Sequence, residues 1–450
     1  MMSNEIKHLI ANTKFYEKIV LTIIFLLPLS LTMSIFIADL FSVILSIFFF
    51  SLIFNKDPIL SNVIYIKKPL IVILLFFFIV IVSLIFSNDF SKSFLPSFFY
   101  FRYFLMSLII YVYICKYRYL INLIMFSLLL TFSLIFFDSF IELLEIKGLL
   151  NFELNEYKNK SENSYIITSF FNEEKKLGSF LARLLPLVLS LIIYTKYRPF
   201  DKINFNNFVI LTCGLMIIFT SERTALFLFV LIFIFLLKFI QNKKKLIITM
   251  MTIFIIVLIT NPRIGEKYIL ATTTQFNITT DYTFDSFFRS GINLNLTNLK
   301  YLSEEHEKLI LSGIEVFKEN PIIGSGIKTY HEECNKIKKI KNLDIVCSTH
   351  PHNTYIQLLA AVGILGTLVV IAIFFYILLL NIKIFKKKDP SRILISIYIL
   401  NLGIIINLMP FIPSGSFFNN WICLMIHYPL GFWFFLSSEI SKNGYQVNGK

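Results

Sequence analysis

Long apolar runs separated by short polar segments make up most of the 450-residue chain. An α-helix needs about 20 apolar residues to cross a hydrocarbon core about 30 Å thick. The pattern predicts an all-α polytopic membrane protein with about twelve transmembrane helices. The predicted spans are 19–37, 40–54, 69–86, 97–115, 119–140, 178–195, 205–220, 224–240, 246–260, 356–380, 393–410 and 420–437.

One long polar loop, 261–355, sets the predicted organisation of the chain. It separates nine predicted spans in 1–260 from three in 356–437, and 438–450 form a tail. Its Lys and Arg residues (11) balance its Asp and Glu residues (11), which favours a small folded lobe. A second long loop is predicted at 141–177.

The lobe contains the pattern of an amphipathic helix. Ser303 is a suitable N-cap, and Glu304 follows it beside the positive end of the helix dipole. Apolar residues then recur at helical spacing until Pro321 stops the helix. His306 lies on the same stripe as these apolar residues. We expect this helix to lie on the membrane bundle.

Composition agrees with a membrane protein, because 56% of the residues are hydrophobic and only 16% are charged. The net charge of +14 does not indicate nucleic acid, since the basic residues gather in alternate loops. The loops on the side of the N-terminus and the two tails hold 22 Lys and Arg, whereas the short loops on the other side hold only Lys92 and Arg223. This asymmetry predicts a membrane protein with both termini in the cytoplasm and with 261–355 on the opposite, periplasm-like side. The first run lacks a cleavage site before the second and is predicted to be an uncleaved span.

Cys334 and Cys347 both fall in the predicted periplasmic lobe. An oxidising compartment favours a disulfide between them, and two free thiols is the alternative. The chain contains no CxxC, HExxH or GxxxxGK[ST] motif. We therefore predict no metal site, no cofactor and no nucleotide-driven reaction.

Three arginines are candidates for binding an anion. Arg223 opens a predicted span at its periplasmic end, where a guanidinium suits phosphate oxygens; a guanidinium that snorkels to the headgroups is the alternative. Arg183 and Arg102 lie about one turn inside predicted spans, where a charge is usually paired or faces water. Glu173 is a possible partner for Arg183, and a structural pair with Asp138 or a lipid phosphate is the alternative for both arginines.

The densest group of polar residues directly precedes the tenth predicted span. His350, His352 and Asn353 lie there, and a histidine near neutral pH can donate or accept a proton in a transfer reaction. A contact with lipid headgroups is the alternative. His331 has only ordinary polar neighbours in the sequence and is interpreted as a solvated loop residue.

The order of these segments resembles the bacterial O-antigen ligase and O-antigen polymerase superfamily. The resemblance covers roughly 165–436, and its first spans agree only in number and type. It depends on five ordered segments: Phe170–Phe180, Ser221–Leu226, Phe317–Gly326 after His306, His350–Gly366, and Pro413–Trp421.

The resemblance implies an inverting, metal-independent glycosyltransferase that uses an undecaprenyl-diphosphate-linked glycan as donor at the periplasmic face. It implies that Arg223 holds the donor diphosphate and that His352 lies near the acceptor hydroxyl. The basic residue that family members often carry before Ser-Phe-Phe is missing at Thr168, so Arg183 or Arg289 would complete the diphosphate site. The acceptor would be lipid A core for a ligase or a growing glycan for a polymerase.

Two other classes of protein remain open. Twelve spans also suit a lipid-linked polysaccharide flippase, but an equal two-half carrier would have its long linker after the sixth span, where 195–204 is short. A non-catalytic membrane scaffold is the third alternative. The sequence does not distinguish ligase from polymerase and does not identify the sugars, the acceptor or the oligomeric state.

Overall fold

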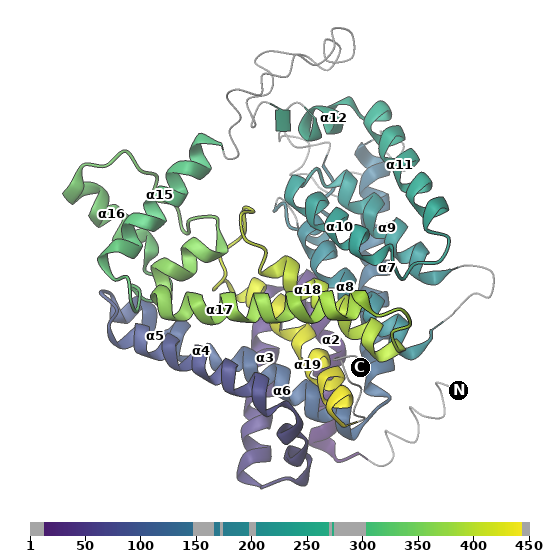
Figure 1. The fold of residues 1–450 in the computed structure, drawn as a ribbon, viewed down its shortest axis with the longest axis horizontal. Helices are drawn as coiled ribbons and strands as arrows, with labels where there is room; N and C mark the ends of the chain where they lie inside the picture. The colour runs from purple at the N-terminus through teal and green to yellow at the C-terminus, as the bar shows by residue number, and fades with distance from the viewer. Residues whose placement is uncertain are drawn as a thin grey trace. The chain divides into compact units, whose positions relative to one another are not determined.

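The computed structural model describes residues 13–146, 166–171, 174–197, 204–269, 272–273 and 303–442. Within these ranges the regular structure is helical, without strands (Figure 1). The α-helices are α2 (Phe15–Met33), α3 (Ile35–Phe54), α4 (Lys67–Ile85), α5 (Phe90–Phe98), α6 (Phe101–Lys116), α7 (Leu120–Ile146), α8 (Leu177–Thr195), α9 (Phe205–Phe219), α10 (Arg223–Leu236), α11 (Lys243–Thr260), α12 (Pro262–Tyr268), α15 (Glu304–Glu319), α16 (Tyr330–Lys341), α17 (Thr354–Lys386), α18 (Arg392–Asn407) and α19 (Asn420–Lys442). Two 3₁₀ helices are η1 (Pro58–Ile66) and η3 (Ser169–Phe171).

Each predicted span lies mainly in one of these α-helices, although 19–37 crosses from α2 into α3 at Ser34 and 97–115 begins at the end of α5. Eight segments in the described ranges are long and apolar enough to cross a membrane. The pair α11 and α12, bent by 114°, would form a ninth as a broken span or a re-entrant loop. The apolar helices α9, α10 and α18 are shorter. The chain is therefore an integral membrane protein, while the count of twelve spans and the side of each loop stay predictions.

The chain divides into two compact units. Unit 1 comprises Met1–Thr131, Pro186–Tyr197 and Ile310–Lys450, and unit 2 comprises Phe132–Leu185 and Arg198–Leu309. The boundaries fall inside α7, α8 and α15, so each of these helices contributes to both units.

In unit 1, α6 packs against α3 and α19, and α17 packs against α4 and α18. The α6–α19 contact is close because a Cβ atom added to Gly431 would lie only 2.7 Å from Cβ of Ile110. Small residues permit such approach between membrane helices, where dispersion contacts rather than water exclusion hold helices together.

A break interrupts α17 at Gly363, whose φ of 63° lies in the left-handed region that favours glycine. The loop 321–326 satisfies the backbone groups freed on both sides of the break. Its N–H groups donate to the carbonyl groups of Ala360 (2.8 Å) and Ala361 (3.0 Å), and its first carbonyl group accepts from the N–H of Ile364 (2.9 Å). Non-helical backbone in a membrane helix requires such partners. These hydrogen bonds hold the segments 317–326 and 350–366 against one another in the structure.

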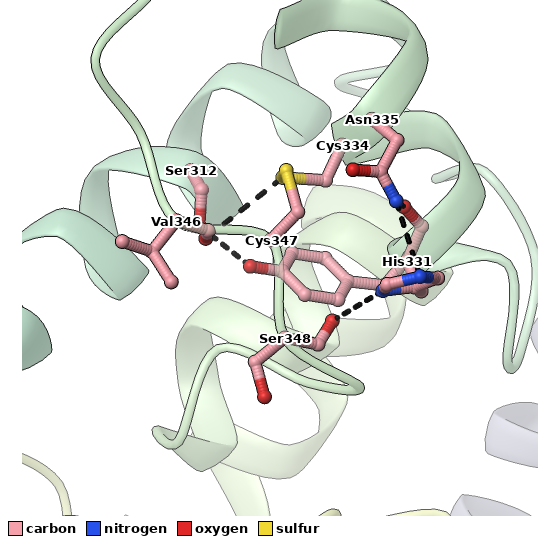
Figure 2. The surroundings of a disulfide bond; sticks show 8 residues. Ser312, His331, Cys334, Asn335, Val346, Cys347 and Ser348 are labelled. Carbon is pink, nitrogen blue, oxygen red and sulfur yellow. Dashed lines mark hydrogen bonds between the residues drawn. A yellow bond between two sulfur atoms is a disulfide. The ribbon is translucent and has the colours of Figure 1, made fainter.

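The predicted amphipathic helix is confirmed as α15, which begins directly after Ser303 and ends at Glu319. Its C-terminal part joins a small core in unit 1. The members of this core are Val316, Tyr330, Cys334, Ile337, Ile345 and Ala360. Cys334 and Cys347 form a disulfide with a Cα–Cα distance of 5.6 Å, and it joins α16 to the segment before α17 (Figure 2).

Unit 2 contains α9, α10, α11 and α12, drawn in teal in Figure 1. Helix α9 packs against α10 and α11, and α11 packs against α12. The phenol of Tyr268 on α12 donates to the carbonyl groups of Ile217 and Ile218 near the end of α9, both at 3.1 Å. Helix α7 extends to Ile146, further than the apolar run that ends at 140, because Asp138 and Glu142 have partners inside the protein.

Candidate functional site

Arg223 is the first residue of α10 and follows a tight turn after α9. We call residues 219–223 the Arg223 turn. Ser221 in this turn has a φ of 53°, and its side chain is buried. The Arg223 side chain is half-buried. A fixed turn between two packed helices restricts where the guanidinium can reach.

Glu222 connects this turn to the start of α8. Its carboxylate accepts hydrogen bonds from the N–H groups of Gly178 (2.7 Å) and Ser179 (3.1 Å). A carboxylate at a helix N-terminus satisfies N–H groups that have no partner within the helix, and it is favoured by the helix dipole. Burial raises the pKa of Glu222 to about 7, although these two N–H donors act in the opposite direction. The sequence interpretation did not single out Glu222, although a Glu directly before an apolar helix was the available signal.

Arg183 is buried on α8, and its Nε donates to the hydroxyl of Ser179 at 3.1 Å. Glu222 is a carboxylate close enough to act on the Arg183 charge. The neighbouring Glu174 forms an ion pair with Lys176 instead. Glu173, the predicted partner, lies outside the described residues, as does Arg289.

Asp138, another predicted partner for a buried arginine, has a different role. It accepts a hydrogen bond from the hydroxyl of Ser169 (2.6 Å), and Glu142 one turn along α7 accepts from the N–H groups of Thr168 (3.0 Å) and Ser169 (2.8 Å). The two carboxylates thus hold the segment that precedes α8. Ser169 has a φ of 49°, which this anchoring maintains.

Two lysines that the sequence interpretation did not select also lie near the Arg223 turn. Lys267 on α12 is half-buried and close enough to Lys175 and Arg223 to experience both positive charges. Lys175 lies two residues before the first helical residue of α8 and is close to Glu222. Unit 2 therefore gathers basic side chains around one turn.

In unit 1, His350 and His352 lie directly before α17 with their ring centroids 4.0 Å apart. His352 has a φ of 51°, a conformation that histidine tolerates better than β-branched residues do. Its carbonyl group accepts from the N–H of Ser414 at 2.8 Å, and the hydroxyls of Thr354 and Ser414 are 2.9 Å apart. The segment after α18 therefore fixes the backbone that carries the two histidines.

Gln357, further along α17, also binds the segment that follows α18. The amide of Gln357 donates to the hydroxyl of Ser416 at 2.8 Å and accepts from the N–H of Phe417 at 2.7 Å. The side chain of Asn353 caps α17, because its oxygen accepts from the N–H groups of Tyr355 (3.0 Å) and Ile356 (3.2 Å). This bonding accounts for Asn353 as an N-cap; its predicted part in catalysis stays a prediction.

The two histidines differ in their surroundings. Burial, and then the adjacent charge of His352, lower the pKa of His350 to about 4. Nδ1 of His350 lies 3.0 Å from the hydroxyl of Thr349, while its Nε2 is buried without a hydrogen-bond partner in the described part of the chain. A pKa this low makes His350 a weak base near pH 7, so His352 stays the candidate to accept a proton.

Arg102 lies in unit 1 and is paired. Its Nε and Nη2 bind the two carboxylate oxygens of Asp39 on α3, at 2.9 and 3.2 Å. The guanidinium also lies 4.2 Å from the ring centroid of Tyr103, and Asn420 donates to the same Asp39 at 3.2 Å. A fork–fork pair of this kind orients both groups, and the acid is Asp39 rather than the predicted Asp138.

His306 and His331 both lie on helices. Nδ1 of His306 is 2.7 Å from the hydroxyl of Ser303 at the start of α15. The interpretation of His331 as a loop residue is wrong, because it lies in the first turn of α16. There its Nδ1 is 3.1 Å from the carbonyl oxygen of Ser348, beside the disulfide (Figure 2). The sequence of this helix is mostly polar and shows no apolar run that would have predicted it. The helix is held by the small core, to which it contributes Cys334.

The described ranges contain no group of three or more His, Cys, Asp or Glu side chains that could hold a metal ion. Comparison with family models matches residues 208–371 to the family described as O-antigen ligase. This match supports the O-antigen ligase/polymerase superfamily as the family that the chain resembles. No curated protein matches the chain.

The matched segment contains Arg223 and His352 together with Glu222 and Lys267. It also includes the loop 321–326 that closes the break in α17. Arg102 and Arg183 lie before the segment that matches. The match supports the transfer of lipid-linked glycans in a membrane as the general activity.

Proposed function

We propose that the chain is an inverting, metal-independent glycosyltransferase that moves an undecaprenyl-diphosphate-linked glycan onto an acceptor at the periplasmic face of the inner membrane. The observation that carries this proposal is the gathering of basic side chains around the Arg223 turn, within the segment that matches the O-antigen ligase family. A lipid diphosphate is negatively charged and is bound by positively charged side chains. The half-buried guanidinium of Arg223 at this turn is such a group.

In the proposed reaction the acceptor hydroxyl attacks the anomeric carbon of the donor glycan. The new C–O bond forms with inversion while the bond from that carbon to the phosphate oxygen breaks, and the electron pair leaves with undecaprenyl diphosphate. The hydroxyl proton passes to His352. The departing diphosphate gains one negative charge, so a fixed guanidinium at Arg223 stabilises the transition state more than the ground state.

Two substitutions test these roles in membranes with matched expression, using purified lipid-diphosphate-linked glycan as donor. Arg223→Lys keeps the charge and loses the bidentate fork, so we expect turnover to fall about 10- to 100-fold. Arg392→Lys, at the start of α18, is the matched control and should retain wild-type activity. Wild-type turnover in Arg223→Lys would contradict the proposed donor site.

His352 requires a substitution that respects its backbone. We expect His352→Ala to reduce turnover about 10²- to 10⁴-fold if the imidazole is the base. His352→Asn separates chemistry from strain, because Asn adopts positive φ readily, and it should be equally inactive. His331→Ala is the control. If His352→Asn were active and His352→Ala inactive, transfer would require the backbone conformation at this position and not the imidazole of His352.

The acceptor is tested in a deletion strain. Long chains left on the lipid carrier would identify a ligase that uses lipid A core, and single repeat units on core would identify a polymerase that extends a glycan. An unchanged surface polysaccharide would contradict both and would favour a scaffold. Accumulation of the donor on the cytoplasmic face would favour a flippase.

A further inference from the structure

The segment between α18 and α19 is hydrogen-bonded to the start of α17. The N–H of Ser414 donates to the carbonyl group of His352 at 2.8 Å. Further along α17 the buried amide of Gln357 donates to the hydroxyl of Ser416 at 2.8 Å and accepts from the N–H of Phe417 at 2.7 Å. The segment and the residues that carry His352 are therefore held together at two places.

The end of the same segment is joined to α3 and α6. Asn420, the first residue of α19, donates through its side-chain amide to Oδ2 of Asp39 at 3.2 Å. Asp39 on α3 also accepts from Nε and Nη2 of Arg102 on α6, at 2.9 and 3.2 Å. The helices α3, α6 and α19 pack on one another in unit 1. The ion pair thus provides a fixed point for the end of the segment.

The backbone of His352 requires such support. Its φ of 51° lies in the left-handed region, and a residue other than glycine keeps this conformation where the surrounding structure holds it. The N–H of Ser414 provides one of the contacts that do so. If Ser414 moved, His352 could return to a negative φ, and its imidazole would point in another direction.

We propose that Gln357 and Asn420 are positioning residues for His352, and that the Asp39–Arg102 pair acts on the reaction through the segment between α18 and α19. These residues all lie in unit 1, whereas Arg223 lies in unit 2. A loosened segment should therefore lower kcat and leave the donor KM unchanged. This inference rests on the proposed function, because it takes His352 as the proton acceptor.

The first test removes the amide of Gln357. Gln357→Met keeps a flexible side chain of similar length that cannot donate to the segment. We expect kcat for transfer from purified lipid-diphosphate-linked glycan, by the full-length protein in membranes, to fall about 10- to 100-fold. A displacement approaching 1 Å at a reacting group has an effect of this size. The donor KM should stay within about threefold of the wild type.

Asn381→Leu is the matched control on the same helix. Asn381 is also buried, donates to the carbonyl group of Tyr398 at 3.1 Å and accepts from the amide of Asn401 at 2.7 Å. The control therefore also removes one donated and one accepted hydrogen bond, in the part of α17 that follows the break at Gly363. At matched expression it should keep the wild-type kcat.

A double variant separates positioning from a general loss of structure. If Gln357 acts through His352, Gln357→Met should cause no further loss beyond about threefold when His352→Ala is already present. A role in folding alone would lower kcat by the same factor with and without the imidazole. Such additive losses would overturn the positioning role.

Asn420 is tested by two substitutions that a structural role would rank in the opposite order. Asn420→Asp places a second carboxylate beside Asp39 and should lower kcat by about tenfold or more, further than Asn420→Ala, which only removes the hydrogen bond. If Asn420 served only to begin α19, Asp would be the better residue, because a negative charge is favoured in the first turn of a helix.

Asn419→Asp is the matched control for Asn420→Asp. The side-chain oxygen of Asn419 accepts from the N–H of Trp421 at 2.9 Å, and a carboxylate caps a helix equally well. This variant makes the same chemical change at the adjacent residue and should keep the wild-type kcat.

The outcomes separate the two proposals. Wild-type kcat in Gln357→Met and in Asn420→Asp, together with impaired His352→Ala, would overturn the positioning role and leave the proposed function standing. Wild-type kcat in His352→Ala would overturn the proposed function itself. If Gln357→Met does not accumulate in membranes, the comparison of Asn420→Asp with Asn420→Ala decides the positioning role, and higher activity of Asn420→Asp would overturn it.

Discussion

Gly178→Ala tests whether close packing at the start of α8 positions Arg223. The added Cβ would lie 2.6 Å from Oγ1 of Thr220, 3.0 Å from Cβ of Ala225 and 3.1 Å from Oε1 of Glu222. Thr220 cannot simply rotate away, because its hydroxyl donates to the carbonyl group of Ile217 at 2.8 Å. The turn must therefore shift by several tenths of an ångström. Overpacking of this kind costs about 1–3 kcal/mol, and a displacement approaching 1 Å at a reacting centre costs up to about 10²-fold in rate.

Two measurements follow this substitution: resistance of the purified protein to unfolding by SDS, and glycan transfer in membranes. We expect a loss of about 1–3 kcal/mol in stability and a loss of about 10- to 100-fold in turnover. Gly415→Ala is the matched control, since the nearest atoms to its new Cβ belong to Ile422 at an ordinary 3.8 Å. Equal stability and equal turnover of Gly178→Ala and Gly415→Ala would show that close packing at Gly178 does not position Arg223.

The remaining predictions concern topology, the disulfide and pH. Reporter fusions after Lys245 should report cytoplasm and fusions near Asn342 periplasm, and a cytoplasmic signal at Asn342 would contradict periplasmic chemistry. Cys334→Ser should lower stability by about 3 kcal/mol and loosen the segment before α17, and two free thiols in the wild type under non-reducing mass spectrometry would refute the bond. The His350 pKa of about 4 lies below its usual 6.5, so the unfolded state binds more protons as pH falls. Stability should therefore decline from pH 6.5 towards 4, and His350→Gln should flatten this decline in SDS unfolding. The Glu222 pKa of about 7 lies above its usual 4.5, so stability should decline as pH rises from 4.5 through 7, and an equally steep decline in Glu222→Gln would contradict this cause.

The sequence by itself determined the long apolar helices, because apolar length and spacing act locally. A run of about 20 apolar residues has few alternatives to a helix in lipid, where each backbone group needs an internal partner. The same local logic identified α15 from Ser303 and Pro321. It also selected Arg223 and His352, since each directly precedes or begins an apolar helix and therefore lies at a helix end.

Only the tertiary structure decided which side chains meet. Asp39 and Arg102 are 63 residues apart, and no local pattern favours Asp39 over Asp138 as the partner. Glu222 reaches the N–H groups of Gly178 and Ser179 across more than 40 residues, and Tyr268 brings α12 to the end of α9 across about 50. These contacts depend on how helices pack in three dimensions. Helical periodicity determines the faces of a helix but not the helix that each face contacts. For the same reason Lys267 lies near the Arg223 turn only through the tertiary structure, in which Tyr268 attaches α12 to the end of α9.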